Sequence, residues 1–250
     1  MPEFRGIDHL RFYLYRSRSK IEMLYEQIYK SDVTTGRKSI AANLRVVSGS
    51  AESSRERVVS LDEKLRAVEE ELEHRQLIGT IDEPKEYFRG TMKMRWGLFN
   101  DQGTRPQDEP ALVYFGGINK EEIPIVVGLG GSSMHVEGHR GATSTYSRSA
   151  GPTLVRWLLS ALKGEEPIRT LWDVESERGE VHTAMAVALH YFPPPSYNLT
   201  FLAKTLSTGV LSGYDYMIGV KKARMLLGTP IWVSQAPSDE ENVWGLDDQW

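Results

Sequence analysis

The sequence contains no cysteine among its 250 residues. It therefore cannot form a disulfide, a thiolate zinc site, an iron–sulfur cluster or a cysteine nucleophile. It also lacks the run of roughly 18 apolar residues that a membrane span needs, and its N-terminus holds no apolar stretch typical of a secretion signal. With 40% hydrophobic and 26% charged residues, the composition is that of a folded globular chain. We therefore expect a cytoplasmic protein with no membrane segment.

An excess of basic charge is also missing, because the formal net charge is −4. The last thirteen residues, 238–250, hold five acids and no base, and without those five the remaining 29 acids face 30 bases. Global charge therefore makes nucleic acid an unlikely ligand without excluding it. The acidic tail also carries Trp244 and Trp250. Such a segment can dock on a protein partner, although C-terminal tails commonly pack on their own domain.

Helical periodicity appears in three segments. A strand at 10–15 is followed by a helix that opens at Ser19, and a second helix is predicted over 60–79. Both helices open on a Ser-x-x-Glu capping box, which satisfies two free backbone donors. A third helix is predicted over 152–164. The narrow apolar stripe of 60–79 could pair with a partner helix, but packing on its own domain is favoured.

Strands are predicted from alternation and from apolar runs. The clearest is 87–99, and the others are expected at 111–115, 123–129, 181–192, 199–206 and 225–233. The alanines of 181–192 keep a helix open there. Because strands outnumber helices without strict alternation, we expect an α+β fold with a mostly antiparallel sheet covered by about three helices. A single domain over 1–237 would then precede the tail 238–250.

A glycine-rich turn is predicted after the apolar run that ends at Leu129. Glycines let successive backbone N–H groups point into one concavity, and two hydroxyls add donors, so the turn could bind a phosphate or carboxylate. The residues concerned are Gly130, Gly131, Ser132 and Ser133. The segment lacks the lysine and the spacing of a nucleotide fingerprint, and an ordinary hairpin turn or bulge is the alternative.

A second anion-binding candidate is the junction between the first strand and the first helix. It carries Arg16, Ser17, Arg18 and Lys20. Free N–H groups and the positive end of the helix dipole favour an anion there, and the cationic side chains would reinforce it. Solvated surface charge is the alternative. If the fold joined this junction to the glycine-rich turn, a nucleotide-like or other phosphate-bearing ligand would fit.

A metal site is the third candidate. His135, Glu137 and His139 stand at i, i+2 and i+4, which share one side of a strand, and they are the ligand types of a hydrolytic zinc or a similar divalent metal. Side chains at i and i+2 stand roughly 7 Å apart, which is wide for one ion. A polar strand end is therefore the alternative.

The outward face of the 87–99 strand is basic. It carries Arg89, Lys93 and Arg95 near Tyr87, a combination that can contact single-stranded RNA. Only one aromatic residue accompanies the cations and no RNA-binding signature is present. An ordinary exposed strand face is the favoured interpretation.

The sequence resembles an uncharacterised bacterial family along nearly its whole length. The segments that carry the resemblance are YLYRSRSKIEML (13–24), RG (89–90), MRWG (94–97), VGLGGS (127–132) with His135, FLAK (201–204) and LGTP (227–230). The resemblance implies a place near predicted antiviral or biological-conflict genes. It implies a sensor or accessory component rather than a housekeeping enzyme, and it carries over no catalytic residues.

The expected function is therefore a ligand-sensing or accessory binding module that acts through a protein partner. No Gly-x-Ser-x-Gly elbow or other catalytic signature is present, so an enzyme is not favoured. One alternative is a metal-dependent hydrolase or nuclease using the His135, Glu137 and His139 triplet. The other is a non-enzymatic interaction protein that docks through the 60–79 helix and the tail.

Overall fold

The computed structural model describes residues 11–35, 59–99, 112–119, 122–138, 195–212 and 222–236, with residues 182, 185, 188 and 189. The chain divides into two compact units. One unit, residues 17–78, is the helical unit. The other joins residues 1–16 to residues 79–250 and is the barrel unit. The predicted 152–164 helix and the tail 238–250 lie outside the described residues.

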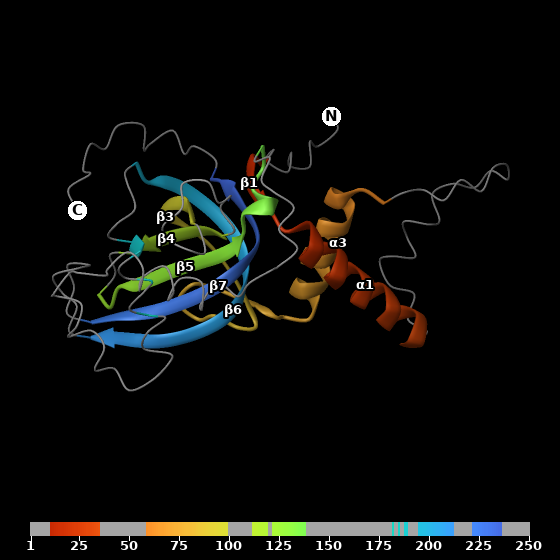
Figure 1. Ribbon diagram of the computed structural model, residues 1–250. Helices are drawn as coiled ribbons and strands as arrows, with labels where there is room; N and C mark the ends of the chain where they lie inside the picture. Colours follow the sequence, from red (N-terminus) through yellow and green to blue (C-terminus); the bar gives the residue numbers. More distant parts are fainter. Residues whose placement is uncertain are drawn as a thin grey trace, which may run out of the picture. The chain divides into compact units, whose positions relative to one another are not determined.

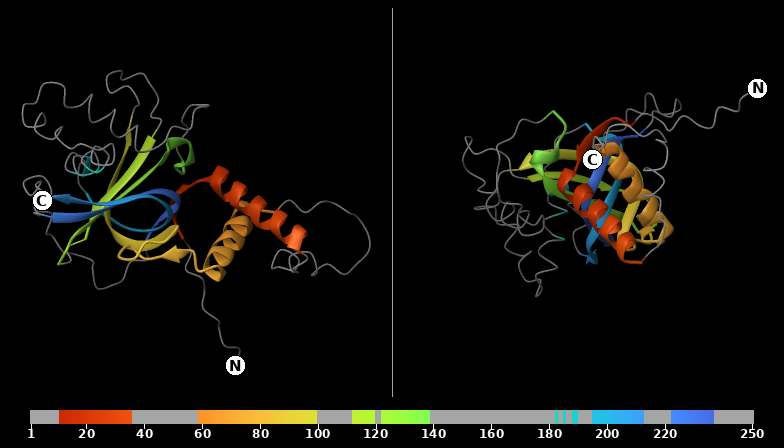
Figure 2. Two further views of the ribbon diagram at one scale, coloured as in Figure 1. Left: turned by 90° about the horizontal axis from the view of Figure 1, so that it is seen from below. Right: turned by 90° about the vertical axis from the view of Figure 1, so that its right-hand side faces the viewer.

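The helical unit contains α1 (Arg18–Thr35) and α3 (Leu61–His74), which contact each other (Figure 2). The predicted capping box of α3 is confirmed, because Glu63 N–H donates to Ser60 Oγ over 3.2 Å and Ser60 N–H donates to Glu63 Oε2 over 2.9 Å. Its buried stripe steps by three and four residues through Leu65, Val68 and Leu72. No described helix is long and apolar enough to cross a membrane.

Two predicted helix ends differ from the structure. α1 begins at Arg18, one residue before the predicted cap at Ser19, and Ile21 N–H donates to the Ser17 carbonyl over 3.0 Å. α3 ends at His74, because Gln76 adopts a left-handed φ of 56° that stops the helix before Gly79.

The barrel unit is a closed five-stranded barrel (Figure 1). Its strands are β3 (Tyr87–Phe99), β4 (Leu112–Ile118), β5 (Ile125–Ser132), β6 (Tyr197–Ser212) and β7 (Lys222–Gln235). They pair in the order β3-β4-β5-β7-β6 and β6 closes on β3. Among the pairs that these five described strands form, only β5–β7 is parallel. β1 (Tyr13–Arg16) adds to β7, and the short β2 (Ile78–Gly79) adds to β3.

The expected α+β fold is therefore wrong. Strands dominate the described residues, and the sheet closes on itself instead of lying under about three helices. Long-range pairing causes the closure, because the first half of β3 pairs with β6 and its second half pairs with β4. This pairing order with its single parallel pair is the strand topology of an OB-fold barrel. That topology serves many functions, so it assigns none by itself.

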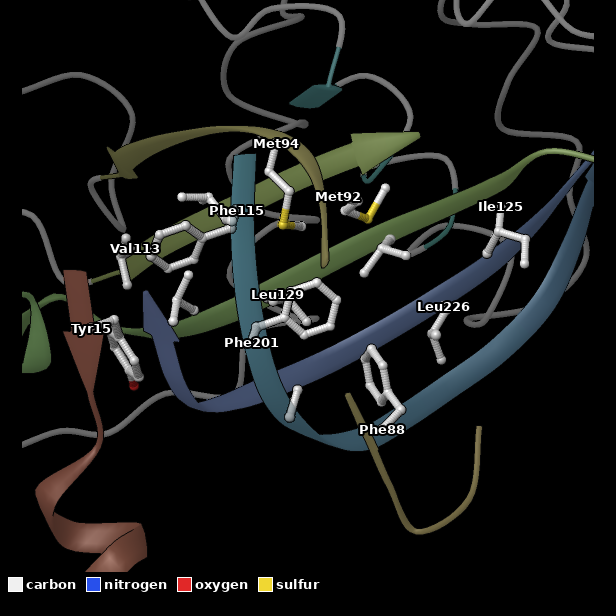
Figure 3. Close-up of a cluster of buried hydrophobic side chains, with 14 residues drawn as sticks. Tyr15, Phe88, Met92, Met94, Val113, Phe115, Ile125, Leu129, Phe201 and Leu226 are labelled. Atoms are coloured by element: carbon white, nitrogen blue, oxygen red, sulfur yellow. The ribbon is translucent and has the colours of Figure 1, made fainter. Parts of the chain in front are cut away.

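The hydrophobic core fills the barrel (Figure 3). Alternate residues of every strand point inward, so the predicted alternation of 87–99 is confirmed with Phe88, Met92 and Met94 inside. The Phe88 and Phe201 rings meet edge to face with centroids 5.7 Å apart. Tyr15 of β1 reaches the same core and is fully buried.

The outward face of β4 and β5 is also buried. Tyr114 points away from the core cluster, yet its side chain is 0% exposed. Gly128 lies where an added Cβ would stand 2.2 Å from Tyr114 Oη and 2.9 Å from Met185 Cε. Met185 is one of four residues described between 139 and 194, and all four are helical. The strand preferred for 181–192 is therefore wrong there.

Candidate functional site

Six basic side chains of the barrel unit share the outer surface of the sheet β1-β7-β6-β3. We call this surface the basic face; it consists of Arg11, Arg16, Arg89, Lys93, Arg95 and Lys204. Register places Arg16, Arg89, Lys93 and Lys204 together, because residues directly opposite each other on paired strands point to the same side. Arg95 follows Lys93 on the same side of β3, and the Arg11 guanidinium reaches this surface over the Trp232 ring. One row across the four strands reads Arg16, Trp232, Leu202 and Arg89.

The next row toward the start of β1 is polar. Tyr13 lies opposite Ser234, Ser234 opposite Thr200, and Thr200 opposite Thr91. The hydroxyl oxygens of Thr91 and Thr200 are 2.9 Å apart, which is a hydrogen bond. Thr91 is exposed, and so is Lys93, which follows on the same side of β3. Hydroxyl donors thus stand between the cations in reach of solvent.

Aromatic rings hold two of the arginines in place. The Arg11 guanidinium lies 4.7 Å from the centroid of the Trp232 ring, and the Arg16 guanidinium lies 4.8 Å from that of Tyr13. The two rings meet edge to face at 6.0 Å. Such cation–π contacts order a guanidinium without neutralising its charge.

Two carboxylates reach the basic face at its borders. Arg16 Nε donates to Glu137 Oε1 over 2.7 Å, and Lys204 Nζ lies 3.5 Å from Glu86 Oε1. The Lys204 ammonium is also 5.8 Å from the Tyr87 ring. Burial and the nearby Glu86 carboxylate together raise the pKa of the Tyr87 phenol. The phenol therefore stays neutral near pH 7 and adds no negative charge.

The predicted glycine-rich turn is a strand. Gly130 and Gly131 lie within β5, opposite Tyr114 and Val113 of β4, so the expectation of a turn there is wrong. In an extended strand successive N–H groups point to alternate sides, not into one concavity. Gly131 leaves room for the Tyr15 side chain, since an added Cβ would stand 2.5 Å from Tyr15 Oη.

The two serines that follow end the strand. Ser132 is the last residue of β5, and its Oγ accepts a hydrogen bond from Met134 N–H over 3.4 Å. Ser133 is buried and opens a short 3-10 helix over Ser133–His135.

The predicted cationic junction divides between the two units. Arg16 belongs to the barrel unit, whereas Ser17, Arg18 and Lys20 belong to the helical unit. Ser17 is fully buried and Arg18 is exposed. Burial lowers the pKa of the Lys20 ammonium to about 8. Arg16 belongs to the basic face of the barrel unit.

The predicted metal ligands have other contacts. His135 meets the Tyr15 ring edge to face at 5.9 Å, and the Glu137 carboxylate is bonded to Arg16. His139 lies outside the described residues. Within the described part of the chain, no group of three His, Asp or Glu side chains could hold a metal.

Sequence reasoning singled out four cations of this face and missed Arg11 and Lys204. Arg89, Lys93 and Arg95 follow from alternation within one strand, and Arg16 was expected in a different anion site, at the junction with the first helix. Lys204 joins the face through the β3–β6 pairing, and Arg11 joins it through its contact with Trp232 of β7. A signal for Lys204 exists in the sequence, because Asn198, Thr200 and Lys204 alternate with apolar residues. That alternation predicts a polar side for β6 but not its neighbour.

Comparison with known proteins gives one result. A family model matches residues 11–237, and its description is "Family of unknown function (DUF7019)". The match covers all the strands and helices described above. No curated protein and no solved structure matches the chain.

Proposed function

Since the chain belongs to the DUF7019 family of unknown function, we propose from its geometry that it is a binding module for a phosphate-bearing ligand, with the basic face as its site. The observation that carries the proposal is the gathering of six cations on one surface formed by four strands. Several cations on one surface raise the local concentration of an anionic ligand and its association rate.

The exposure of side chains decides which outer face of the barrel we propose as the site. OB-fold barrels commonly bind ligands on the outer face of their second and third strands. Here that face belongs to β4 and β5, and its outward residues Leu112, Tyr114 and Val126 are at most 3% exposed. The basic face instead keeps Arg11, Thr91, Lys93 and Lys204 exposed. A ligand in solution can therefore reach the basic face.

The proposal also explains why neutral hydroxyls stand between the cations. Arg and Lys attract a phosphate from a distance, whereas hydroxyl groups fix its orientation at contact. Thr91 and Thr200 lie between Arg89 and Lys93 along β3 and its partner strand. A phosphate on this surface would meet both kinds of donor.

Inorganic polyphosphate is the probe that tests the proposal. We expect polyphosphate to bind the full chain with an affinity that falls as the salt concentration rises, because the protein's Lys and Arg side chains displace counterions from the polyphosphate. Lys93→Gln and Lys204→Gln should each weaken binding several-fold. Lys222→Gln is the matched control, because Lys222 is an exposed lysine at the start of β7, opposite Ser212 and away from the basic face. Equal effects of all three variants would refute the site.

The wider role remains a proposal as well. The resemblance to a bacterial conflict-associated family suggests that the bound state is passed to a protein partner, through the 238–250 tail or the 60–79 helix. Affinity capture from a bacterial host with the full chain and with a chain ending at Pro237 tests the tail. Capture of the same proteins in equal amounts by both chains would count against it.

A further inference from the structure

We infer that the phosphate-bearing ligand is a single-stranded nucleic acid that crosses the barrel rim, with its phosphates on the basic face and its bases on exposed aromatic rings. The inference rests on the proposed function and names its ligand class. The rim meant here is the end of the barrel where β1 and β6 begin and β7 ends. There Gln235 N–H donates to the Phe12 carbonyl, and Ala236 N–H donates to the Asn198 carbonyl.

Large apolar side chains are exposed on the inner side of this rim. Phe12 is 66% exposed, Tyr197 is 41% exposed and Leu98 is 38% exposed. Tyr197 lies opposite Met94, a buried core residue, so it projects on the core side of β6. Gln235 lies opposite Leu199, a core residue, and its N–H donates to the Phe12 carbonyl, so the register places Phe12 on the core side as well.

Cations stand on the outer side of the same rim. Lys93 lies opposite Asn198, the residue that follows Tyr197. Arg95 follows two residues later on the same side of β3, and Arg11, next to Phe12, covers the Trp232 ring. Adjacent residues thus carry opposite functions, with a ring turned inward and a charged or polar group turned outward.

This division fits a single strand better than other polyanions. Every nucleobase offers a flat apolar face that stacks on an aromatic ring, and the backbone offers phosphates beside it. One strand, β7, separates Phe12 from Tyr197, so the two residues come from chain segments about 10 Å apart, which is two interstrand spacings. A duplex hides its base faces and inorganic polyphosphate has none, so neither would use the rings.

Anisotropy of a fluorescein-labelled RNA 12-mer tests the inference on the full chain. Phe12→Ala and Tyr197→Ala should each weaken RNA binding about fivefold or more, which is the effect of losing one base-stacking contact. Both variants should leave the affinity for polyphosphate unchanged. Val210→Ala is the matched control, because Val210 is 57% exposed on β6 beside Arg224 rather than at the rim. It should change neither affinity.

The outcomes separate the two proposals. The inference is supported if the Phe12→Ala and Tyr197→Ala variants bind the RNA 12-mer, or a DNA 12-mer of the same sequence, more weakly than the original chain does. Comparing the two 12-mers shows whether the ligand is RNA, DNA or either. Binding of polyphosphate without any effect of the ring variants on RNA overturns the inference and leaves the proposed function standing. Equal affinity for the duplex form also overturns it. Absence of binding to every probe overturns both.

Discussion

The Arg16 guanidinium donates a hydrogen bond to the Glu137 carboxylate across 2.7 Å and a separation of 121 residues in sequence. The pair ties β1 to the segment that follows β5. Its side chains remain 22% and 44% exposed, so water screens the attraction. Exposed ion pairs of this kind contribute roughly 0–1 kcal/mol to the free energy of unfolding. The stronger effect of Glu137 is on the charge that Arg16 presents to a ligand.

Replacing Glu137 should therefore improve binding. Glu137→Gln removes one negative charge beside Arg16, at the border of the basic face. We expect tighter polyphosphate binding and a free energy of unfolding that falls by less than about 1 kcal/mol. Polyphosphate titration and urea unfolding measure the two effects. Weaker binding by a stably folded Glu137→Gln variant would contradict the placement of the site at Arg16.

The close approach of Tyr114 to Gly128 predicts that a side chain at position 128 would destabilise the fold. A Cβ there would stand 2.2 Å from Tyr114 Oη, and Tyr114 is fully buried. Gly128→Ala should therefore lower the free energy of unfolding by about 1–3 kcal/mol, the usual cost of overpacking a core.

The double variant Gly128→Ala with Tyr114→Phe checks the cause. Removing the hydroxyl relieves the shortest contact, so the two substitutions should couple by about 0.5 kcal/mol or more. Urea unfolding of both single variants and the double variant gives this coupling. Strict additivity would show that the hydroxyl is not the group that excludes a side chain at 128.

The strand 87–99 shows what the sequence could predict. Its alternation gave the correct bounds and the correct inward and outward sides, because the period of two is a local property. Closure into a barrel was not predictable, since it depends on pairing Tyr87 with Lys204 and Arg95 with Gly116. Strand partners distant in sequence leave no mark in a local pattern.

Glycine misled the prediction for a specific physical reason. Gly130 and Gly131 were expected in a turn because glycine commonly supplies unusual backbone angles. In this barrel, an absent Cβ at 131 makes room for the Tyr15 ring, and that ring comes from β1. The candidate site was only partly predictable for a similar reason. Arg89 and Lys93 share one strand, whereas Arg16 and Lys204 reach the same face from two others.

Burial of Lys20 predicts a pH dependence of stability. Its pKa is lowered to about 8 in the folded chain, against about 10.4 for an unfolded lysine. Between these values the unfolded chain binds more protons, so the free energy of unfolding rises with pH from about 8 upward and is lower below pH 8. Lys20→Met should remove this rise and stabilise the protein at pH 7.

Urea unfolding at pH 7, 8, 9 and 9.5 measures the Lys20 effect. The series stops at pH 9.5 because of Tyr114, whose phenol pKa is raised by burial in the folded chain. Near and above pH 10 the phenol ionises in the unfolded chain first, which destabilises the fold. Lys222→Met, at an exposed lysine, is the control and should keep the rise. A Lys20→Met variant with the same pH profile as the original chain would contradict the assignment.

The acidic tail should oppose ligand binding. Residues 238–250 carry five carboxylates and no base, and they follow closely on Ala236, whose N–H is bonded to the Asn198 carbonyl at the barrel rim. Tethering raises the effective concentration of those charges at the rim. A chain ending at Pro237 should therefore bind polyphosphate and the RNA 12-mer more tightly, and the gain in affinity should shrink as salt screens the charges.

A matched control chain keeps the tryptophans of the tail and changes its five acids to their amides, at Asp239, Glu240, Glu241, Asp247 and Asp248. An equal gain in affinity by this chain assigns the effect to charge. If neither the shortened chain nor the amide chain binds polyphosphate more tightly than the original chain at low salt, the tail's carboxylates do not compete for the basic face.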